Sequence, residues 1–322
     1  MSEIFLHVGL HKTATTALQQ RLRRNRDTLS RNGFFYPDPG RFDAHHELAS
    51  LLRVDDEASL IDPAGEVQFF KGLAACKLEA FGRNVILSSE IFSQNVSRFA
   101  IPKLSRLFDR VTVVLYLRRQ DTLLESVHNQ MLKQSAFRSE DIVHSGFYPA
   151  CDLHGTVAMW KSLVGDSNVI VRRYEPAKMF MDDIAMDFLR AIGMPTDLHW
   201  SETKSEQLND SLSMIEYLVL DRLATSEWPE WHRVVDTAKQ IVREKFSGRD
   251  CQMVGHYLTY QERVAFLDEH ADGNAKLLAE FFPEDDRLFA APARHPDFRH
   301  DAGLQRDVQT AHADVLRELG VA

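Results

Sequence analysis

The sequence has few cysteines, and their spacing suits neither a metal site nor a disulfide-rich fold. Only three of the 322 residues are cysteine, and no CxxC or His/Cys ligand spacing occurs. An odd number of widely separated cysteines excludes a full disulfide framework and favours a reducing compartment. We therefore expect a cytoplasmic protein. The cysteines are Cys76, Cys151 and Cys251.

Long apolar runs and an excess of positive charge are also missing. No stretch approaches 18 apolar residues, so the sequence predicts no membrane span. The first eight residues lack a basic segment followed by an apolar run, so they predict a strand and not a signal peptide. The formal net charge is -9, which argues against nucleic acid as a partner. A protein of this charge that binds an anion must gather its cations in one place.

Short apolar runs alternate with amphipathic stretches over the first 200 residues. The apolar runs are nearly continuous, which is typical of strands buried on both faces of a parallel sheet. The alternation predicts an α/β, P-loop-like three-layer fold with a central parallel sheet flanked by helices. The main predicted strands are 4–8, 84–88, 111–117 and 168–172, with a short extended run after Gly33. The predicted helices begin near Thr15 and cover about 47–52, 66–81, 121–133 and 182–192.

The pattern changes after about residue 200. A capping box at Ser213 and Glu216 opens a mostly helical stretch, and a short helix is predicted near 307–319. No internal repeat or low-complexity tract occurs. We expect a single domain over 1–322, in which 1–200 form the α/β nucleotide-binding core and 201–322 a mainly helical C-terminal portion.

One polar loop lies between the first predicted strand and the first helix. It has the sequence Gly-Leu-His-Lys-Thr-Ala-Thr-Thr and spans Gly9–Thr16. A helix N-terminus offers free N–H groups and a positive dipole end, Lys12 adds a charge, and Thr13, Thr15 and Thr16 add hydroxyl donors. The loop therefore predicts a cradle for a phosphate or sulfate ester, although an ordinary strand-to-helix turn is the alternative. It is not a Walker A motif, because no glycine directly precedes Lys12.

A second basic position follows the strand 111–117. Arg118 lies at the carboxyl end of that strand, where open α/β sheets bind ligands, and its guanidinium can hold a phosphate by two hydrogen bonds. Ser126 follows eight positions later, in the next predicted helix. Taken alone, an arginine in this position is more often a surface charge, and its pairing with the Gly9–Thr16 loop favours the binding role. Two arginines at a strand end do not suit a cation, so we expect no metal site.

These motifs together resemble a known family. The Gly9–Thr16 loop resembles the 5′-phosphosulfate loop of sulfotransferases that use 3′-phosphoadenosine-5′-phosphosulfate (PAPS), typically Lys-[Ser/Thr]-Gly-Thr-Thr. It is most similar to the loops of bacterial sulfotransferases and of the heparan sulfate N-sulfotransferase branch. Ala14 departs from the family, which usually has glycine there. The resemblance implies PAPS as cofactor, PAP (3′-phosphoadenosine-5′-phosphate) as product, and Arg118 with Ser126 at the 3′-phosphate. The implied cofactor-binding residues are His11, Lys12, Thr13, Ala14, Thr15, Thr16, Arg118 and Ser126.

Sulfuryl transfer to an acceptor hydroxyl or amine also needs a base and a neutralised leaving group. Lys12 would neutralise the charge that grows on the leaving phosphate oxygen. Glu90, directly after the strand 84–88, is our first choice of base, and the resemblance supports it. The rival is the pair His45 and His46, which can instead cap a helix or line the acceptor pocket.

Two other classes of function compete with a sulfotransferase. A P-loop-type nucleotide kinase or hydrolase would bind ATP or GTP with Mg²⁺, and the missing Walker glycines disfavour it. A non-catalytic module would bind a phosphorylated ligand without turnover. The sequence leaves open the oligomeric state and the acceptor, which we expect to be a carbohydrate, lipid or other small molecule. We expect the segments 38–65 and 134–165 to shape the acceptor pocket.

Overall fold

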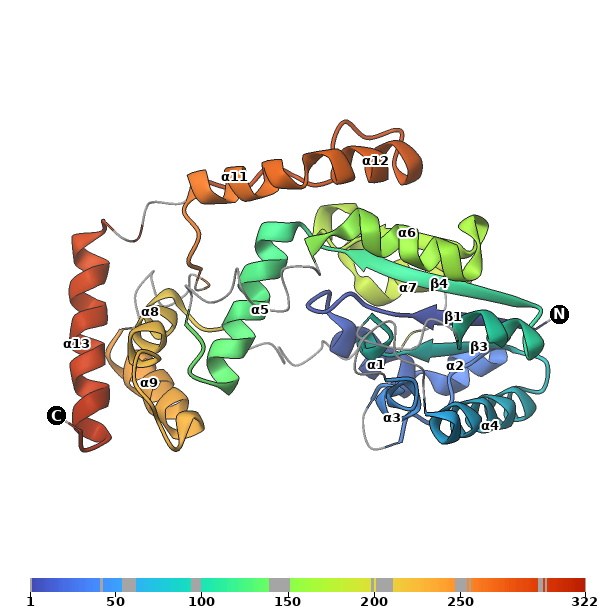
Figure 1. The fold of residues 1–322 in the computed structure, drawn as a ribbon, viewed down its shortest axis with the longest axis horizontal. Coiled ribbons are helices and arrows are strands. Elements are labelled where there is room, and N and C mark those ends of the chain that lie inside the picture. The colour runs from blue at the N-terminus through green and yellow to red at the C-terminus, as the bar shows by residue number, and fades with distance from the viewer. Residues whose placement is uncertain are drawn as a thin grey trace. The chain divides into compact units, whose positions relative to one another are not determined.

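The structure, a computed structural model, resolves into two compact units (Figure 1). One comprises Met1–Arg118 and Leu153–Leu208, and the other comprises Arg119–Asp152 and Asn209–Ala322. The prediction of one domain over 1–322 stays a prediction. The structure describes residues 2–40, 43–53, 62–93, 100–138, 151–197, 200, 211–246, 254, 256–294, 298 and 300–321.

The first unit is built on a five-stranded sheet in the order β2-β3-β1-β4-β5. Every adjacent pair of strands is parallel. The central strands are buried almost throughout, as the continuous apolar runs predict. The α/β prediction, with a central parallel sheet flanked by helices, is confirmed. The strands are β1 (Glu3–His7), β2 (Phe34–Phe35), β3 (Asn84–Ser88), β4 (Arg110–Leu117) and β5 (Val169–Arg173).

Helices cover both faces of this sheet. On one face, α1, α2 and α7 share a hydrophobic cluster with Phe5, Ile86 and Val114 of the sheet. Side chains alternate along a strand, so the fully buried Leu6 and Leu87 point to the other face, which α4 and α6 cover. This gives three layers. The helices are α1 (Thr15–Arg24), α2 (Arg26–Arg31), α3 (His46–Ser50), α4 (Pro63–Ala80), α6 (Leu153–Val164) and α7 (Ile184–Ala191).

Helices α2 and α6 were not among the predicted elements, and α6 is the longer of the two. Leu153, Val157 and Trp160 are buried at the spacing i, i+4, i+7, so the periodicity that marks an amphipathic helix was present. The end of the segment 134–165, expected to shape an acceptor pocket, is thus a helix that packs on β4 and β5. Short 3-10 helices lie at η1 (Glu90–Ser93), η2 (Ile101–Arg106), η5 (Asp166–Asn168), η6 (Pro176–Lys178) and η7 (Phe180–Asp182).

The second unit is helical in the part of the chain that the structure describes. Helices α8, α9 and α13 enclose its largest hydrophobic cluster. The predicted capping box is confirmed, since Ser213 and Glu216 exchange hydrogen bonds between side chain and backbone. No described helix is long and apolar enough to cross a membrane. The helices are α5 (Gln120–Gln134), α8 (Met214–Leu223), α9 (Trp231–Lys245), α11 (Tyr260–Glu269), α12 (Ala271–Phe281) and α13 (Ala302–Glu318).

Candidate functional site

The strand order brings three strand ends together at one edge of the sheet. Strand β1 lies between β3 and β4, and all three run in the same direction. The chain builds β2 and β3 on one side of β1 before it crosses to β4 on the other side, which makes this edge a topological switch point, where open α/β sheets bind ligands. The loop after β1, Glu90 after β3 and Arg118 after β4 therefore share one region.

The loop between β1 and α1 has an unusual backbone. Lys12 has φ of 63°, and Ala14, the N-cap residue of α1, has φ of 56° and ψ of 31°. The fully buried Thr13 donates its hydroxyl to the Leu10 carbonyl over 2.7 Å, which holds the loop in shape. Ala14, the N-cap residue, has no polar side chain with which to cap α1. The N–H groups of its first turn, where Thr15 is buried and Thr16 exposed, are thus available to an anion.

Ala14 occupies a backbone region that favours glycine. We expect Ala14→Gly to raise the free energy of unfolding by about 1 kcal/mol, because it removes the contact of Cβ with the backbone that an L-residue makes at positive φ. Urea unfolding of the variant and the wild type measures the change. Ala17→Gly, in the regular part of α1, is the matched control and should lower the same free energy by about 0.5–1 kcal/mol. Equal losses in both variants would contradict the prediction.

The two cationic residues of the predicted site lie together. The guanidinium of Arg118 donates to the backbone carbonyl of Lys12 over 2.5 Å. Its Cζ also lies 5.6 Å from the centre of the Tyr174 ring, which supports the side chain from another side. The structure thus links the end of β4 directly to the loop after β1.

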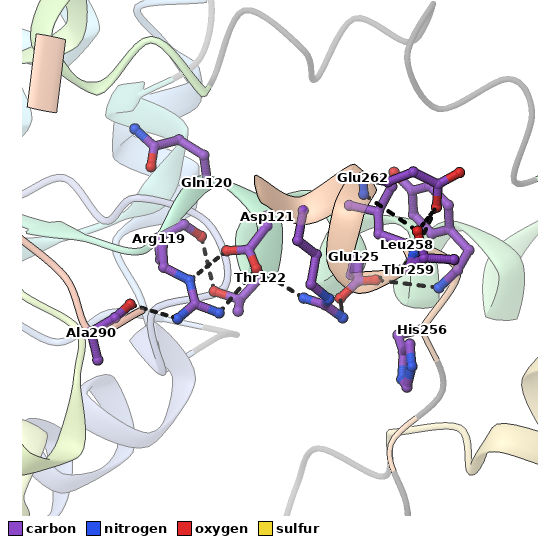
Figure 2. Close-up of polar contacts among 12 residues, drawn as sticks. Arg119, Gln120, Asp121, Thr122, Glu125, His256, Leu258, Thr259, Glu262 and Ala290 are labelled. Atoms are coloured by element: carbon purple, nitrogen blue, oxygen red, sulfur yellow. Dashed lines mark hydrogen bonds and ion pairs between the residues drawn. The ribbon is translucent and has the colours of Figure 1, made fainter. Parts of the chain in front are cut away.

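Ser126 and Arg119 belong to the second unit. Ser126 is the seventh residue of α5 and is partly buried. Arg119 forms two hydrogen bonds to Asp121, at 2.6 and 2.9 Å, and donates to the Ala290 carbonyl over 2.8 Å (Figure 2). These contacts give Arg119 a structural role within that unit. The role that the resemblance gives Ser126 stays a prediction.

A network of buried charges continues from Arg119 within the second unit. Arg263 on α11 donates to Asp121 over 2.9 Å and pairs with Glu125, both on α5. Glu125 also accepts hydrogen bonds from the N–H groups of Tyr257 and Leu258, at 3.2 and 3.1 Å (Figure 2). The network joins α11 and its preceding segment to α5. Because these charges are buried and hydrogen-bonded to one another, removal of one partner would leave an unpaired buried charge and lower the free energy of unfolding.

Glu90 lies on the other side of the β1–α1 loop. It begins η1, with one residue, Ser89, between it and the end of β3, and the lack of a side chain at Gly9 makes room for it. A Cβ atom on Gly9 would lie 3.4 Å from Cβ of Glu90 and 3.3 Å from the His11 backbone nitrogen. Glycine at position 9, which has φ of 95°, thus permits the close approach of the loop to the candidate base.

His46 is a neighbour of Glu90, so the two rival bases share one location. The Nε2 atom of His46 lies 3.8 Å from Oε1 of Glu90, and its Nδ1 atom lies 2.8 Å from Oγ of Ser89. His11 belongs to the same group. Burial lowers the pKa of His11, the nearby carboxylate of Glu90 opposes this shift, and Lys12 and His46 reinforce it. His11 therefore interacts electrostatically with Lys12, His46 and Glu90.

His45, the other histidine of the pair, faces the interior. Its side chain is buried, its Nδ1 atom accepts a hydrogen bond from the Ser88 N–H over 3.1 Å, and its ring packs edge-on against Tyr36. Burial lowers the pKa of His45 to about 4. These contacts join the start of α3 to β3. Adjacent histidines thus lie in different environments, which the sequence could not distinguish.

His7, which the sequence analysis did not single out, is fully buried beneath the site. Its Nδ1 atom lies 2.8 Å from Oγ of Ser88, and its ring packs edge-on against Tyr116 and Phe188. Its Nε2 atom has no hydrogen-bond partner among the described residues. Burial lowers the pKa of His7 to about 4, and the charge of Glu90 only partly opposes this shift.

The buried His7 makes stability depend on pH. An unfolded histidine takes up its proton near pH 6.5, whereas folded His7 does so near pH 4. Between these values the unfolded state binds more protons, so the free energy of unfolding falls as the pH is lowered, by about 3 kcal/mol for this one residue. Urea unfolding at pH 7 and pH 4 should show a smaller loss for His7→Gln than for the wild type. An equal decrease in the free energy of unfolding between pH 7 and pH 4 in the two proteins would contradict this prediction.

The fold and these contacts define an α/β protein with a polar, cationic strand-loop-helix site at the carboxyl edge of a parallel sheet. Among the described residues, no group of three or more His, Cys, Asp or Glu side chains is arranged to hold a metal ion.

Comparisons with known proteins find distant similarities. No protein-family model matches the sequence. An uncharacterized protein of Archaeoglobus fulgidus is 29% identical over 231 residues, which are 70% of this chain and 61% of that protein. The chain thus spans less than two thirds of that relative's length. The crystal structure of a sulfotransferase from Alicyclobacillus acidocaldarius is similar with a TM-score of 0.39 and 15% identity, over 70% of this chain and 97% of that one.

Proposed function

We propose that this protein binds PAPS and transfers its sulfuryl group to a hydroxyl or amine of a carbohydrate, lipid or other small acceptor. One observation carries the proposal. Arg118 is hydrogen-bonded to the loop that holds Lys12, and Glu90 packs against Gly9 of the same loop while its carboxylate accepts a hydrogen bond from Gln19 on α1. Cations that bind an anionic nucleotide and a base that receives a proton are the two requirements of sulfuryl transfer.

The residues at this edge of the sheet fit such a nucleotide. The N-terminus of α1, whose N-cap residue Ala14 has no polar side chain, offers backbone N–H groups to the 5′-phosphate, and Lys12 and Arg118 supply two positive charges. The buried Thr13 keeps the loop in the shape that exposes those N–H groups. The donor set suits a ligand that carries phosphate at two positions.

Each residue has a separate task in the proposed reaction. PAPS supplies a sulfuryl group on a phosphate leaving group. Lys12 stabilises the negative charge that develops on the leaving phosphate oxygen, and Arg118 holds the 3′-phosphate so that the nucleotide keeps its orientation. Glu90 accepts the proton of the acceptor hydroxyl or amine, with His46 beside it.

A thermal melt tests the proposed ligand. We expect PAP to raise the melting temperature by several degrees, because a ligand at 100 times its Kd stabilises the folded state by about 2.7 kcal/mol. ATP with Mg²⁺ should cause a much smaller rise. Arg118→Ala should reduce the rise with PAP, whereas Arg190→Ala, in the last turn of α7 and with no proposed contact to the nucleotide, should not. A rise with ATP and Mg²⁺ but none with PAP would refute the proposal and favour a nucleotide kinase or hydrolase.

A further inference from the structure

Gln19 connects the helix of the anion-binding loop to the candidate base. It is the fifth residue of α1, and only 3% of its surface is exposed. Its amide nitrogen donates to Oε2 of Glu90 over 3.1 Å and to Oγ of Ser88 over 3.2 Å. The amide has two hydrogens, so both contacts can be made at once. Because the buried amide donates one hydrogen to each of these oxygens, it links Oε2 of Glu90 to helix α1.

The Ser88 end of this bridge is rigid. Ser88 is the last residue of β3, its side chain is fully buried, and its Oγ atom also lies 2.8 Å from Nδ1 of His7. A side chain bound to a fixed point in the sheet loses its freedom to change rotamer. Gln19 therefore presents its second hydrogen to Glu90 in one orientation.

The two carboxylate oxygens of Glu90 consequently differ. Gln19 occupies Oε2, whereas Oε1 points toward His46 at 3.8 Å. An amide N–H can donate to a carboxylate but does not accept its proton, so Oε2 is held as a hydrogen-bond acceptor. Oε1 is the oxygen that remains to receive a proton.

We propose that Gln19 is a positioning residue, which holds Oε2 of Glu90 so that Oε1 faces the acceptor; this inference rests on the proposed function. As the new bond from the acceptor oxygen or nitrogen to sulfur forms, the bond from sulfur to the leaving phosphate oxygen breaks. The electron pair of the broken bond stays on that phosphate oxygen beside Lys12, and the acceptor proton moves to Oε1 of Glu90. Gln19 takes no part in bond making, but it sets the direction of the proton acceptor.

The substitution Gln19→Met tests the inference, because methionine has a similar volume and no donor. Turnover is measured as release of PAP from PAPS with a panel of acceptors: a monosaccharide, an amino sugar, a phenol, a long-chain alcohol and water alone. We expect kcat to fall by about 10–100-fold with the KM for PAPS unchanged. The rise in melting temperature with PAP should also be unchanged. Gln20→Met, the same change at the next, partly exposed position of α1, should leave both quantities unaltered.

A double-mutant cycle with Glu90→Gln separates positioning from a general structural effect. If Gln19 acts through Glu90, Gln19→Met should lower kcat little further in the Glu90→Gln protein. The melting temperatures of the four proteins, measured without ligand, should likewise show losses that are less than additive. Gln19→Asn, which keeps the amide but shortens its reach by one carbon, should resemble Gln19→Met and serves if that variant does not fold.

The outcomes distinguish this inference from the proposed function. A wild type that neither binds PAP nor consumes PAPS would overturn both. Suppose instead that the wild type consumes PAPS and that a folded Gln19→Met or Gln19→Asn protein has the same kcat. That result would overturn the positioning role of Gln19 alone. Fully additive losses in kcat and in melting temperature would do the same, because they would show that Gln19 acts independently of Glu90.

Discussion

Replacement of Glu90 by glutamine should lower the turnover of PAPS by about 10²–10⁴-fold, the usual contribution of a general base. Glutamine has nearly the same shape as glutamate and can still accept a hydrogen bond from the Gln19 amide, but it cannot take the acceptor's proton. The rise in melting temperature with PAP should persist, because the nucleotide contacts proposed for Lys12 and Arg118 remain. Release of PAP from PAPS and the thermal melt with PAP measure the two effects.

The matched comparison for Glu90→Gln is His46→Gln. His46 lies 3.8 Å from the Glu90 carboxylate and is the rival base, so a single pair of variants decides between them. If Glu90 is the base, His46→Gln should lower turnover far less than Glu90→Gln does. A larger loss of turnover in His46→Gln than in Glu90→Gln would indicate that His46 is the base. Full turnover in the Glu90→Gln protein would exclude Glu90 as the base.

Removal of the Lys12 charge should lower turnover by about 10²–10³-fold, which is the size of effect seen when one donor to a developing negative charge is lost. In Lys12→Met the side chain keeps most of its length, so the loss of charge is isolated from a loss of packing. The rise in melting temperature with PAP should shrink as well, because Lys12 also attracts the 5′-phosphate in the ground state. Turnover should suffer more than binding, since the charge on the leaving oxygen grows in the transition state.

Two further variants control for the Lys12 experiment. Lys12→Arg keeps the positive charge and should recover part of the binding of PAP, although a guanidinium has a different shape from an ammonium. Lys71→Met removes a lysine from the exposed side of α4 and should change neither turnover nor binding. A Lys12→Met protein that binds PAP and turns over PAPS as the wild type does would remove Lys12 from the proposed site.

Much of the α/β unit could be predicted because its signals are local. The apolar run of β4 and the break at Gly9 after β1 follow from a few consecutive residues, and the structure has the strands within a residue or so of the predicted bounds. Helix α6 was missed because the local signals around it are weaker. Its buried positions Leu153, Val157 and Trp160 follow a segment with no clear pattern, and the helix had no predicted strand or turn to mark its start.

The candidate site, too, could be predicted only in part from the sequence. That Lys12, Glu90 and Arg118 follow three different strands could be read from the chain, because each lies within a few residues of the end of an apolar run. That His46 lies beside Glu90 while His45 is buried against Tyr36 could not, because the direction of each side chain depends on how α3 packs on β3. The positive φ of Ala14 was equally beyond the sequence, because alanine disfavours positive φ and only the folded loop imposes it.

The sequence by itself therefore determined the strands and most helices of the first unit and the chemical groups at their ends, because burial pattern and residue type are properties of short segments. Tertiary structure decided which of those groups meet. The strand order β2-β3-β1-β4-β5 sets Glu90 and Arg118 on either side of the Lys12 loop, and the packing of α1 on the sheet brings Gln19 to Glu90. Such contacts join residues as far apart as 106 positions in the chain, and periodicity carries no information about partners at that separation.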